Sequence, residues 1–332
     1  MMDTRLRKLM PVLITVAIVI VLAYGFYFFN SGQKTEAVLR STVRLSTPLI
    51  LAAMCGLIGE RTGVVNIGIE GQLLMSAFFA YYAAAATDSI WLGIIIGMVA
   101  GASLGLFLAL CAVTWQIDQI IAGTVINIFA AGMTSFLYTQ GKTVDARWPD
   151  LTIPGLDKIP LIGPVFFDTT RIAFAAIVLA ILLHIALFHT RWGLRSRAVG
   201  ELPSAADTVG VIVSKVRFTN VAIAGAFAGL GGAFLSLEGT SSFERGMSAN
   251  RGFTALAIMI FGRWKPLAAW AGALFFAFTT AMATQLQFDD VVDIPPQFIN
   301  MLPFALVIIV LAALSGRVRP PAAAGKIYTK EG

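Results

Sequence analysis

Residues 90–114 have the sequence IWLGIIIGMVAGASLGLFLALCAVT, which contains no charged side chain. A helix needs about 20 mainly apolar residues to cross a hydrocarbon core ~30 Å thick, so this stretch predicts a transmembrane helix. The pattern recurs along the chain, and the candidate spans are 10–29, 43–59, 66–86, 90–114, 119–140, 171–190, 217–238, 250–262, 266–287 and 297–316. The sequence therefore predicts an all-α, polytopic integral membrane protein of about ten transmembrane helices. We expect one transmembrane domain over residues 1–316 and a tail over residues 317–332.

The charged residues between the spans predict the orientation of the chain. If the N-terminus is cytoplasmic, most of the 24 Lys and Arg residues face the cytoplasm and most of the 18 acids face the other side. This distribution obeys the positive-inside rule, and the reverse orientation breaks it. We therefore expect a bacterial inner-membrane protein with both termini in the cytoplasm. Residues 141–170 then form an extracytoplasmic loop, and residues 191–216 form a cytoplasmic loop.

Composition excludes several classes of protein. Charged residues make up only 13% of the chain, about half the share found in soluble domains. The net charge of +6 needs no nucleic-acid partner, because the excess lies where cytoplasmic loops meet lipid headgroups. Cys55 and Cys111 both lie inside apolar runs, so neither a disulfide framework nor a thiolate metal site is expected. His184 and His189 are interpreted as interfacial residues, and we expect no metal site.

The sequence lacks the motifs of an enzyme. The segment Gly141-Lys142-Thr143 suggests a phosphate-binding loop, but Phe136 occupies the position of the required glycine. H-E-x-x-H, G-x-S-x-G and paired intramembrane acids do not occur. An ion-coupled secondary transporter of a small neutral solute remains an alternative, although such proteins normally carry ionisable relays inside their helices. We therefore expect no catalytic residues, and a substrate path powered by another polypeptide.

The first predicted break in the helices lies near residues 60–71, ERTGVVNIGIEG. If Arg61 marks the membrane surface, Glu70 lies about 14 Å deeper in a helix and nearly twice that in an extended chain. A carboxylate at that depth should face a cavity or a partner. Asn66 could cap a helix that begins there, with Glu70 near its positive end. The alternative is a glutamate at headgroup level on a shallow helix.

A second predicted break lies near residues 248–265. Residues 252–262 (GFTALAIMIFG) stand between Arg251 and Arg263, and a helix of that length covers about 16 Å, roughly half of the hydrocarbon core. One interpretation is a re-entrant segment, which would place the basic C-terminus outside. The interpretation we favour is a short helix whose outer end enters a water-filled vestibule, where irregular backbone is tolerated. Its lining residues would be Ser248, Asn250 and Arg251.

The loop at residues 191–216 contains a predicted helix of its own. The segment from Ser204 to Val209 is preceded by Pro203 and followed by Gly210, which are typical start and stop signals. A solvated loop with no partner is the alternative. A compact helix among short inner loops favours a docking element.

At these same interruptions the sequence resembles a known family. The matching stretches are residues 60–71, residues 118–127 (DQIIAGTVIN), residues 197–206 (RAVGELPSAA), residues 251–257 (RGFTALA) and residues 261–266 (FGRWKP). They resemble the membrane permease subunits of bacterial ABC importers of the ribose/galactose/nucleoside, or simple sugar, type. The most similar group is the shorter permease of nucleoside uptake systems.

The resemblance implies a function and its partners. The chain would translocate a nucleoside or a simple sugar, delivered by an extracytoplasmic solute-binding protein, through ATP-driven alternating access. It would pair with a second permease, as a heterodimer, and with a cytoplasmic ATPase that has two nucleotide-binding halves. ATP and Mg would be bound by that ATPase, and no cofactor by this chain. An exporter or lipid flippase stays a rival, and nucleoside against sugar, homodimer against heterodimer and the residues that contact substrate stay open.

The resemblance and the breaks together suggest site residues. For a neutral solute we expect weak polar contacts along the substrate path, from Asn66, Glu70, Asn127, Asn250, Arg251 and Phe253. Residues 197–210 would form the coupling helix seated in the ATPase, with the contacts made by Arg197, Gly200, Glu201, Pro203, Ala205, Ala206 and Gly210. The loop 141–170 and the acidic turn of Asp289, Asp290 and Asp293 would face the binding protein.

Overall fold

The computed structural model describes residues 32–139, 148, 151–157, 159, 162–288, 301 and 319–329. The predicted spans 10–29 and 297–316 lie outside these residues, apart from residue 301. The acidic turn of Asp289, Asp290 and Asp293 and most of the segment 140–150 also lie outside them. Everything below concerns the described part of the chain.

The described chain is helical apart from one small sheet. Its α-helices are α2 (Gly32–Glu60), α3 (Ile69–Thr87), α4 (Ile90–Ala109), α5 (Gln119–Leu137), α6 (Arg171–His189), α7 (Arg191–Glu201), α8 (Pro203–Thr208), α9 (Val213–Ala233), α10 (Arg251–Phe261) and α11 (Pro266–Phe288). Wider π-helical turns are η1 (Leu110–Thr114), η2 (Gly163–Phe167) and η3 (Phe234–Gly239). Strand β1 (Leu151–Thr152) pairs antiparallel with β2 (Asp168–Thr169). The all-α class is confirmed.

Six helices of the described residues are long and apolar enough to cross a membrane. They are Gly32–Glu60, Ile90–Thr114, Gln119–Leu137, Arg171–His189, Val213–Gly239 and Pro266–Gln285. Each overlaps a predicted span, although α2 begins at Gly32 and the prediction began at residue 43. Helix α3 follows the predicted span 66–86 but is not among the six, since its first turns carry Glu70, Gln72 and Ser76. Helix α10 has only 11 residues. The predicted count of about ten transmembrane helices is therefore loose, and the two regions that depart from full crossings are the ones predicted to be broken.

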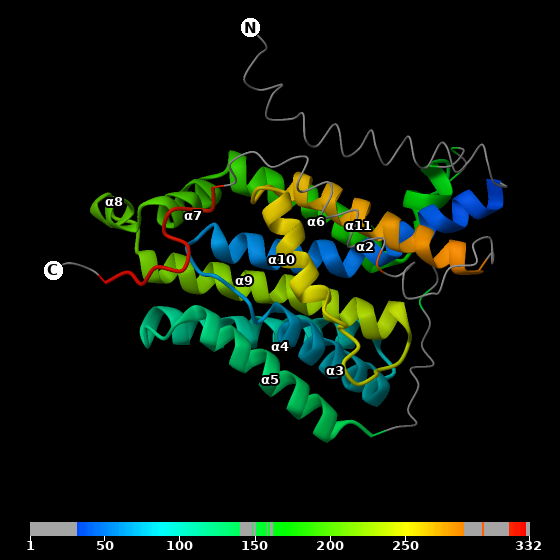
Figure 1. The fold of residues 1–332 in the computed structure, drawn as a ribbon, viewed down its shortest axis with the longest axis horizontal. Helices are drawn as coiled ribbons and strands as arrows, with labels where there is room; N and C mark the ends of the chain where they lie inside the picture. The colour runs from blue at the N-terminus through cyan, green and yellow to red at the C-terminus, as the bar shows by residue number, and fades with distance from the viewer. Residues whose placement is uncertain are drawn as a thin grey trace, which may run out of the picture.

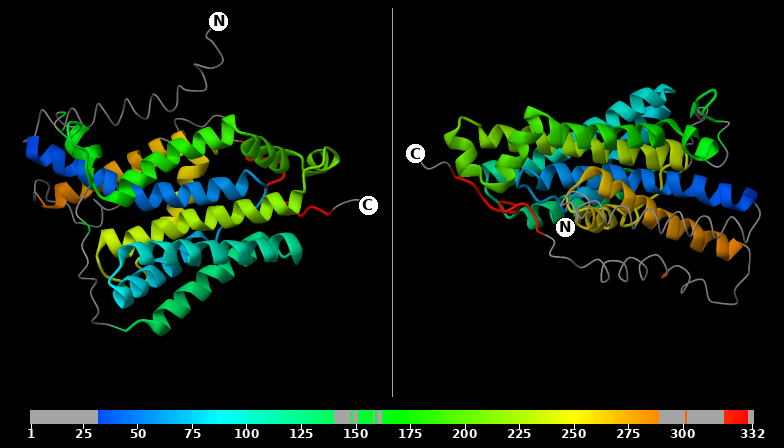
Figure 2. Two further views of the ribbon diagram at one scale, coloured as in Figure 1. Left: turned by 180° about the vertical axis from the view of Figure 1, so that it is seen from behind. Right: turned by 90° about the horizontal axis from the view of Figure 1, so that it is seen from above.

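Helices α2 and α9 form the centre of the bundle. In Figures 1 and 2 they run along the long axis, with α3, α4 and α5 on one side and α6, α10 and α11 on the other. In the most apolar 18-residue stretch of each helix, 89% of the residues of α2 are buried, and 78% of those in the helix formed by α9 and η3. The corresponding share for α5 is 28%. Outer helices such as α5 expose large apolar side chains, among them Ile121, Ile128 and Phe136. Such an exterior suits lipid or another apolar protein surface.

Small residues set the spacing between the central helices, as the sequence AIAGAFAGLGG at 222–232 predicts. A Cβ atom on Gly225 of α9 would lie 2.3 Å from the carbonyl oxygen of Gly101 in α4. The two backbones therefore touch, which only glycine permits. Close approach of this kind replaces the hydrophobic drive that lipid does not supply.

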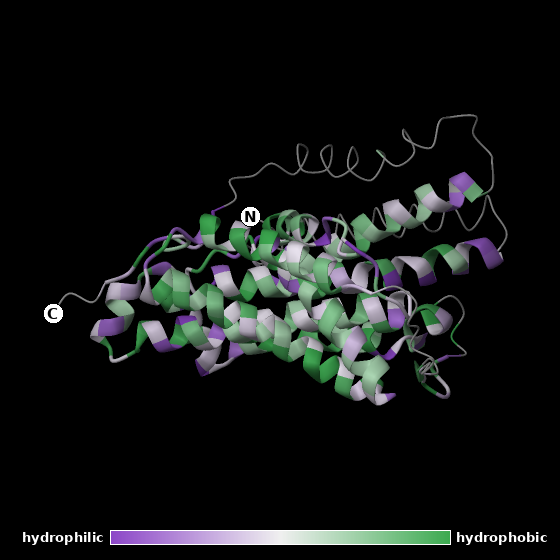
Figure 3. Cartoon of the chain, turned by 90° about the horizontal axis from the view of Figure 1, so that it is seen from below, coloured by the Kyte–Doolittle hydropathy of each residue, from purple (hydrophilic) through white to green (hydrophobic). Residues whose placement is uncertain are grey.

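The bundle has two distinct ends. Helices α7 and α8 project at one end, which we call the arm end, and residues 191–210 are the arm (Figure 1). The two-stranded sheet lies at the opposite end, the sheet end. In Figure 3 the most hydrophilic colours lie towards the two ends of the long axis. This is the distribution expected of a bundle that crosses a bilayer along that axis.

Candidate substrate path and coupling arm

The first predicted break is present between α2 and α3. Helix α2 ends at Glu60 and α3 begins at Ile69. Across the gap, Asn127 of α5 accepts a hydrogen bond from the backbone amide of Gly71 at 2.7 Å and donates one to the carbonyl of Ile67 at 3.0 Å. A broken helix leaves such backbone groups without partners, and inside a membrane they must be satisfied by protein. Asn127 thus lies at the break, where it holds the irregular backbone.

The expected capping role of Asn66 is wrong. The N-cap residue of α3 is Gly68, which has no side chain to cap the helix, and the amide of Gly71 in the first turn bonds to Asn127 instead. Asn66 lies too far ahead of the helix to cap it, and its side chain is buried between α2 and α3. There its amide nitrogen donates to Gln72 Oε1 at 3.0 Å and lies 3.4 Å from Cys55 Sγ.

Glu70 connects the two broken regions. It lies in the first turn of α3, as predicted, but its carboxylate serves a different helix. One oxygen accepts from the amide of Asn250 at 2.8 Å and the other accepts from the amide of Gly252 at 2.7 Å. These amides begin α10, whose unpaired N–H groups and dipole favour a negative charge. A Cβ atom on Gly252 would lie 2.5 Å from the Glu70 amide nitrogen, so glycine is required for this approach.

The remaining residues of the predicted path surround the start of α10. Asn250 is exposed and has φ +62°, and the Phe253 side chain is 43% exposed. Arg251 is half-buried and its Nη1 donates to the carbonyl of Met247 at 2.8 Å. Ser248 is buried, so its expected place on a vestibule wall is wrong. Asn250 and Phe253 are thus the most exposed members of the predicted path, and Glu70, Asn127 and Arg251 are partly exposed.

The other end of α10 is fixed to the end of α2. Trp264 Nε1 donates to Glu60 Oε2 at 2.6 Å, and Arg61 donates from Nε and Nη2 to the Trp264 carbonyl at 3.0 and 2.8 Å. Burial lowers the pKa of Arg61, the Glu201 carboxylate opposes this shift, and Arg197 adds to it. The chain thus passes from the sheet end, where η3 ends, to the arm end through α10. This favours the short helix over the re-entrant segment.

The arm contains the predicted short helix. Helix α8 spans Pro203–Thr208, with proline in its first turn, and Gly210 follows with φ +84°. Helix α7 precedes it, and its first turn is capped by Thr190 Oγ1, which accepts from the amide of Gly193 at 3.2 Å. Large apolar side chains of the arm and the segment after it are exposed, namely Leu194 (62%), Leu202 (58%), Val209 (78%) and Ile212 (62%). An apolar surface of this kind suits a protein partner.

The expected coupling residues fall into two groups. Exposed members are Glu201, Ala205 and Gly210. The inward-facing or partly covered members are Arg197, Gly200, Pro203 and Ala206. Ala206 is 3% exposed and packs with Val199 and Val213. Arg197 lies over the Phe188 ring, 5.1 Å from its centroid.

A buried arginine was missed by the sequence analysis. Arg217 in the first turns of α9 is 1% exposed, and its Nε donates to the Thr62 carbonyl at 3.2 Å. In the sequence it is the charged residue that opens the span 217–238, so it looked like a boundary residue. Nothing in the local pattern indicates that its partners lie in distant segments.

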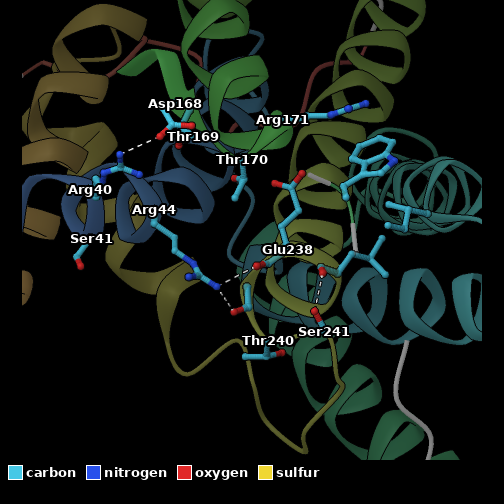
Figure 4. Close-up of a pocket in the computed structure, with 14 residues that line it drawn as sticks. Arg40, Ser41, Arg44, Asp168, Thr169, Thr170, Arg171, Glu238, Thr240 and Ser241 are labelled. Atoms are coloured by element: carbon cyan, nitrogen blue, oxygen red, sulfur yellow. Dashed lines mark hydrogen bonds and ion pairs between the residues drawn. The ribbon is translucent and has the colours of Figure 1, made fainter. Parts of the chain in front are cut away.

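The sheet end contains a large polar cavity (Figure 4). Its volume is about 820 Å³, and its charged lining residues are Arg40, Arg44, Asp168, Arg171 and Glu238. Arg40 pairs with Asp168 at 2.8 Å. Arg44 Nη2 donates to the carbonyls of Glu238 and Gly239 at 3.0 and 2.6 Å. Trp148 and residues 168–170, all from the predicted extracytoplasmic loop, also line the cavity.

No metal centre is found in the part of the chain that the structure describes, where no three His, Cys, Asp or Glu side chains gather closely enough to hold an ion. Most of the polar contacts described in the two broken regions run between side chains and backbone, as those of Asn127, Glu70 and Arg61 do. The geometry therefore combines two broken helical regions, a polar cavity at the sheet end and an arm with an apolar surface.

Comparison with known proteins identifies this architecture. The nucleoside ABC transporter permease protein NupC of Lactococcus lactis subsp. cremoris (strain MG1363) is 36% identical over 91% of this chain and 99% of its own length. The guanosine ABC transporter permease protein NupQ of Bacillus subtilis (strain 168) is 37% identical over 90% of this chain and 98% of its own. A second nucleoside permease of the same Lactococcus strain, NupB, is 23% identical over 92% of this chain and 91% of its own.

A family model agrees with these relatives. The model described as branched-chain amino acid transport system/permease component matches residues 38–311. That match includes both broken regions and the arm. The chain belongs to this permease family and is a membrane permease component of an ABC transporter.

Proposed function

We propose that this permease imports nucleosides by ATP-driven alternating access. The observation that carries the proposal is the similarity to two permeases named for nucleosides and guanosine, each over at least 90% of this chain. A neutral solute also suits the exposed members of the path, Asn250 and Phe253, since an aromatic ring and an amide can hold a base and a sugar weakly. A simple sugar is the second candidate.

The arm is the proposed contact with the ATPase. Its exposed apolar residues, Leu194, Leu202, Val209 and Ile212, need a protein surface to cover them. In this assignment the arm end is cytoplasmic and both chain termini lie on that side, which agrees with the positive-inside rule. ATP and Mg bind to the partner, and this chain contributes motion and no catalytic group.

The sheet end then receives the binding protein. The cavity of about 820 Å³ is large enough for a solute of nucleoside size. The charged residues that line the cavity have both signs, and Arg40 is paired with Asp168. The cavity therefore has little net charge, which suits a neutral solute. A solute that binds weakly in the cavity can be released from it to the residues of the substrate path at the start of α10.

A second permease completes the passage. Helices α4 and α5 expose large apolar side chains, and one Lactococcus strain has both NupC and NupB as nucleoside permeases. A heterodimer of two such chains places a passage between them. The remaining exposed apolar surface faces lipid.

Uptake into proteoliposomes tests the proposal. The chain is reconstituted with its cognate second permease and ATPase, the binding protein is added outside, and radiolabelled guanosine, uridine, ribose and glucose are compared. We expect ATP-dependent nucleoside uptake that stops when the catalytic glutamate of the ATPase is replaced by glutamine. Uptake of sugars alone favours the second candidate. Uptake that follows an ion gradient without ATP contradicts the proposal.

A further inference from the structure

The C-terminal segment at residues 319–329 is not a free tail. It lies at the arm end beside α7 and α9, as both Figures 1 and 2 show. The amide of Ala323 donates to the Gly200 carbonyl at 2.9 Å, and the amide of Gly325 donates to the Gly63 carbonyl at 3.1 Å. Gly200 belongs to the arm and Gly63 to the turn that leads into the first break. One short segment therefore bonds to both.

Buried Arg217 of α9 bonds to the same two segments, the turn and the C-terminal segment. Its Nε donates to the Thr62 carbonyl at 3.2 Å and its Nη1 donates to the Lys326 carbonyl at 3.2 Å. The guanidinium thus joins the turn and the tail, and its rigid fork of donors suits two carbonyls at once. Its side chain is 1% exposed, so these bonds are shielded from water.

The packing at this junction leaves no room for side chains. A Cβ atom on Gly63, whose φ is +89°, would lie 2.8 Å from Arg217 Nη2 and 3.0 Å from the Ala323 carbonyl oxygen. A Cβ atom on Gly200 would lie 2.2 Å from the Arg61 carbonyl oxygen. Arm, turn and tail are therefore in direct backbone contact, and one cannot move far without the others.

The tail also contacts the base of the arm, through one apolar and one polar contact. Tyr328 packs against the cluster of Val199, Ala206 and Val213. The Ala322 amide lies 3.4 Å from Glu201 Oε2. The tail therefore contacts the base of the arm through both a polar and an apolar residue of that base.

We propose that residues 320–328 form a strap that transmits movement of the arm to the turn at residues 61–65. This inference rests on the proposed function, in which the ATPase moves the arm. The turn has two connections into the membrane: Arg61 bonds to the end of α10 at Trp264, and the chain after Val65 leads through the break to Glu70, which holds the start of α10. Displacing the turn therefore shifts both ends of α10. The strap residues are positioning residues that contact no substrate.

A pair of truncations tests the strap in the complete transporter. One ends after Val318 and removes the strap, and its control ends after Thr329 and leaves it intact. We expect the first to assemble with the ATPase and to hydrolyse ATP, with uptake per ATP reduced at least about fivefold, the lower end of typical coupling strengths. The control should match the full chain. The proposal is overturned if the first truncation leaves uptake per ATP unchanged. It is also overturned if assembly is lost but the complexes that remain show an unchanged uptake per ATP.

Two glycine variants keep the test decisive if the truncation does not fold. Gly63→Ala and Gly246→Ala both place a Cβ at a left-handed backbone position, with φ of +89° and +69°. Only Gly63 meets the strap, because nothing lies within 4 Å of a Cβ at Gly246. We expect both variants to lose thermal stability, Gly63→Ala more than Gly246→Ala because its Cβ also meets Arg217 and Ala323, and we expect a lower uptake per ATP in Gly63→Ala alone. Equal ratios overturn the strap.

The readouts separate this inference from the proposed function. If the wild-type transporter carries no nucleoside, the proposed function fails. Coupling is then measured as the stimulation of ATP hydrolysis by the binding protein, which needs no assumption about the solute. Stimulation that survives removal of the strap refutes the strap alone.

Discussion

The arm end and the sheet end of the bundle are built in opposite ways. At the arm end, backbone segments touch at Gly63 and Gly200, and the arginines at 61 and 217 bond to carbonyls of other segments. At the sheet end, charged side chains surround a cavity of about 820 Å³. Close packing transmits displacement, because packed segments have few alternative arrangements. This contrast supports the proposal that the arm end contacts the ATPase and that the sheet end contacts the binding protein.

The largest effect is expected from a charge placed inside the arm end. Ala206→Glu buries a carboxylate among Val199 and Val213, which costs several kcal/mol unless a partner compensates. The matched variant is Ala205→Glu, at an exposed position of the same helix. We expect Ala206→Glu to lower the unfolding temperature strongly, and Ala205→Glu to keep it while uptake falls, because the ATPase contact is disturbed. Equal stability of the two would contradict the assignment of their faces.

The next largest effect is expected from a substitution at the break between α2 and α3. Asn127→Leu leaves the Gly71 amide and the Ile67 carbonyl without partners, at about 1–3 kcal/mol for each buried group. We expect nucleoside uptake to fall while the ATPase still copurifies. The control is Asn127→Asp, which keeps the acceptor for Gly71. Normal uptake by Asn127→Leu would remove this side chain from the path.

Adding a methyl group at Gly200, where the arm touches the turn, should have a similar or smaller effect on stability. Gly200→Ala places a Cβ 2.2 Å from the Arg61 carbonyl oxygen, and overpacking of this kind costs about 1–3 kcal/mol. Gly132→Ala in α5 is the control, since it also replaces a helical glycine but meets nothing within 4 Å. We expect thermal unfolding in detergent to shift only for Gly200→Ala. Equal shifts in the two variants would show that the arm end is not tightly packed.

The link between α3 and α10 predicts a more moderate effect. Glu70→Ala removes both acceptors at the start of α10, and loss of a helix cap costs about 0.5–2 kcal/mol. Glu70→Gln keeps an acceptor oxygen and should lie between alanine and wild type in uptake. If glutamine behaved as alanine does, the charge and not the hydrogen bond would be the relevant property.

The smallest effect is expected at the sheet end. Asp168→Asn removes the ion pair with Arg40, whose side chain is 40% exposed while that of Asp168 is 29% exposed. Solvent and salt screen such pairs, so stability should fall by at most about 1 kcal/mol. Unfolding temperatures at low and high salt measure this, and the difference between wild type and variant should shrink with salt. A loss as large as that of Gly200→Ala would erase the contrast between the ends.

Much of the fold was predictable because lipid constrains the sequence strongly. Apolar runs such as 90–114 and 171–190 predicted the outer helices, and Pro203 with Gly210 predicted α8. The break near residue 66 was visible because Glu70 stands in an apolar run. These signals are local, and each depends on a few neighbouring residues.

The contacts of the site were not predictable, because they join residues far apart in the sequence. Asn66 resembled a helix cap, but the break continues to Gly68 and carries Asn66 into the interior. Glu70 serves α10 across 182 positions to Gly252. The bonds of Arg217 to residues 62 and 326 leave no pattern in a single sequence.

The order of the segments at the arm end has a consequence for biogenesis. During synthesis the ribosome releases the turn at Gly63 first, the arm at Gly200 later, and the residues around Ala323 after both. A nascent chain can insert its helices one by one, yet the hydrogen bonds from Ala323 to the arm and from Gly325 to the turn form only when these late residues arrive. The packing of the arm end is therefore completed only after all the described helices have been synthesised.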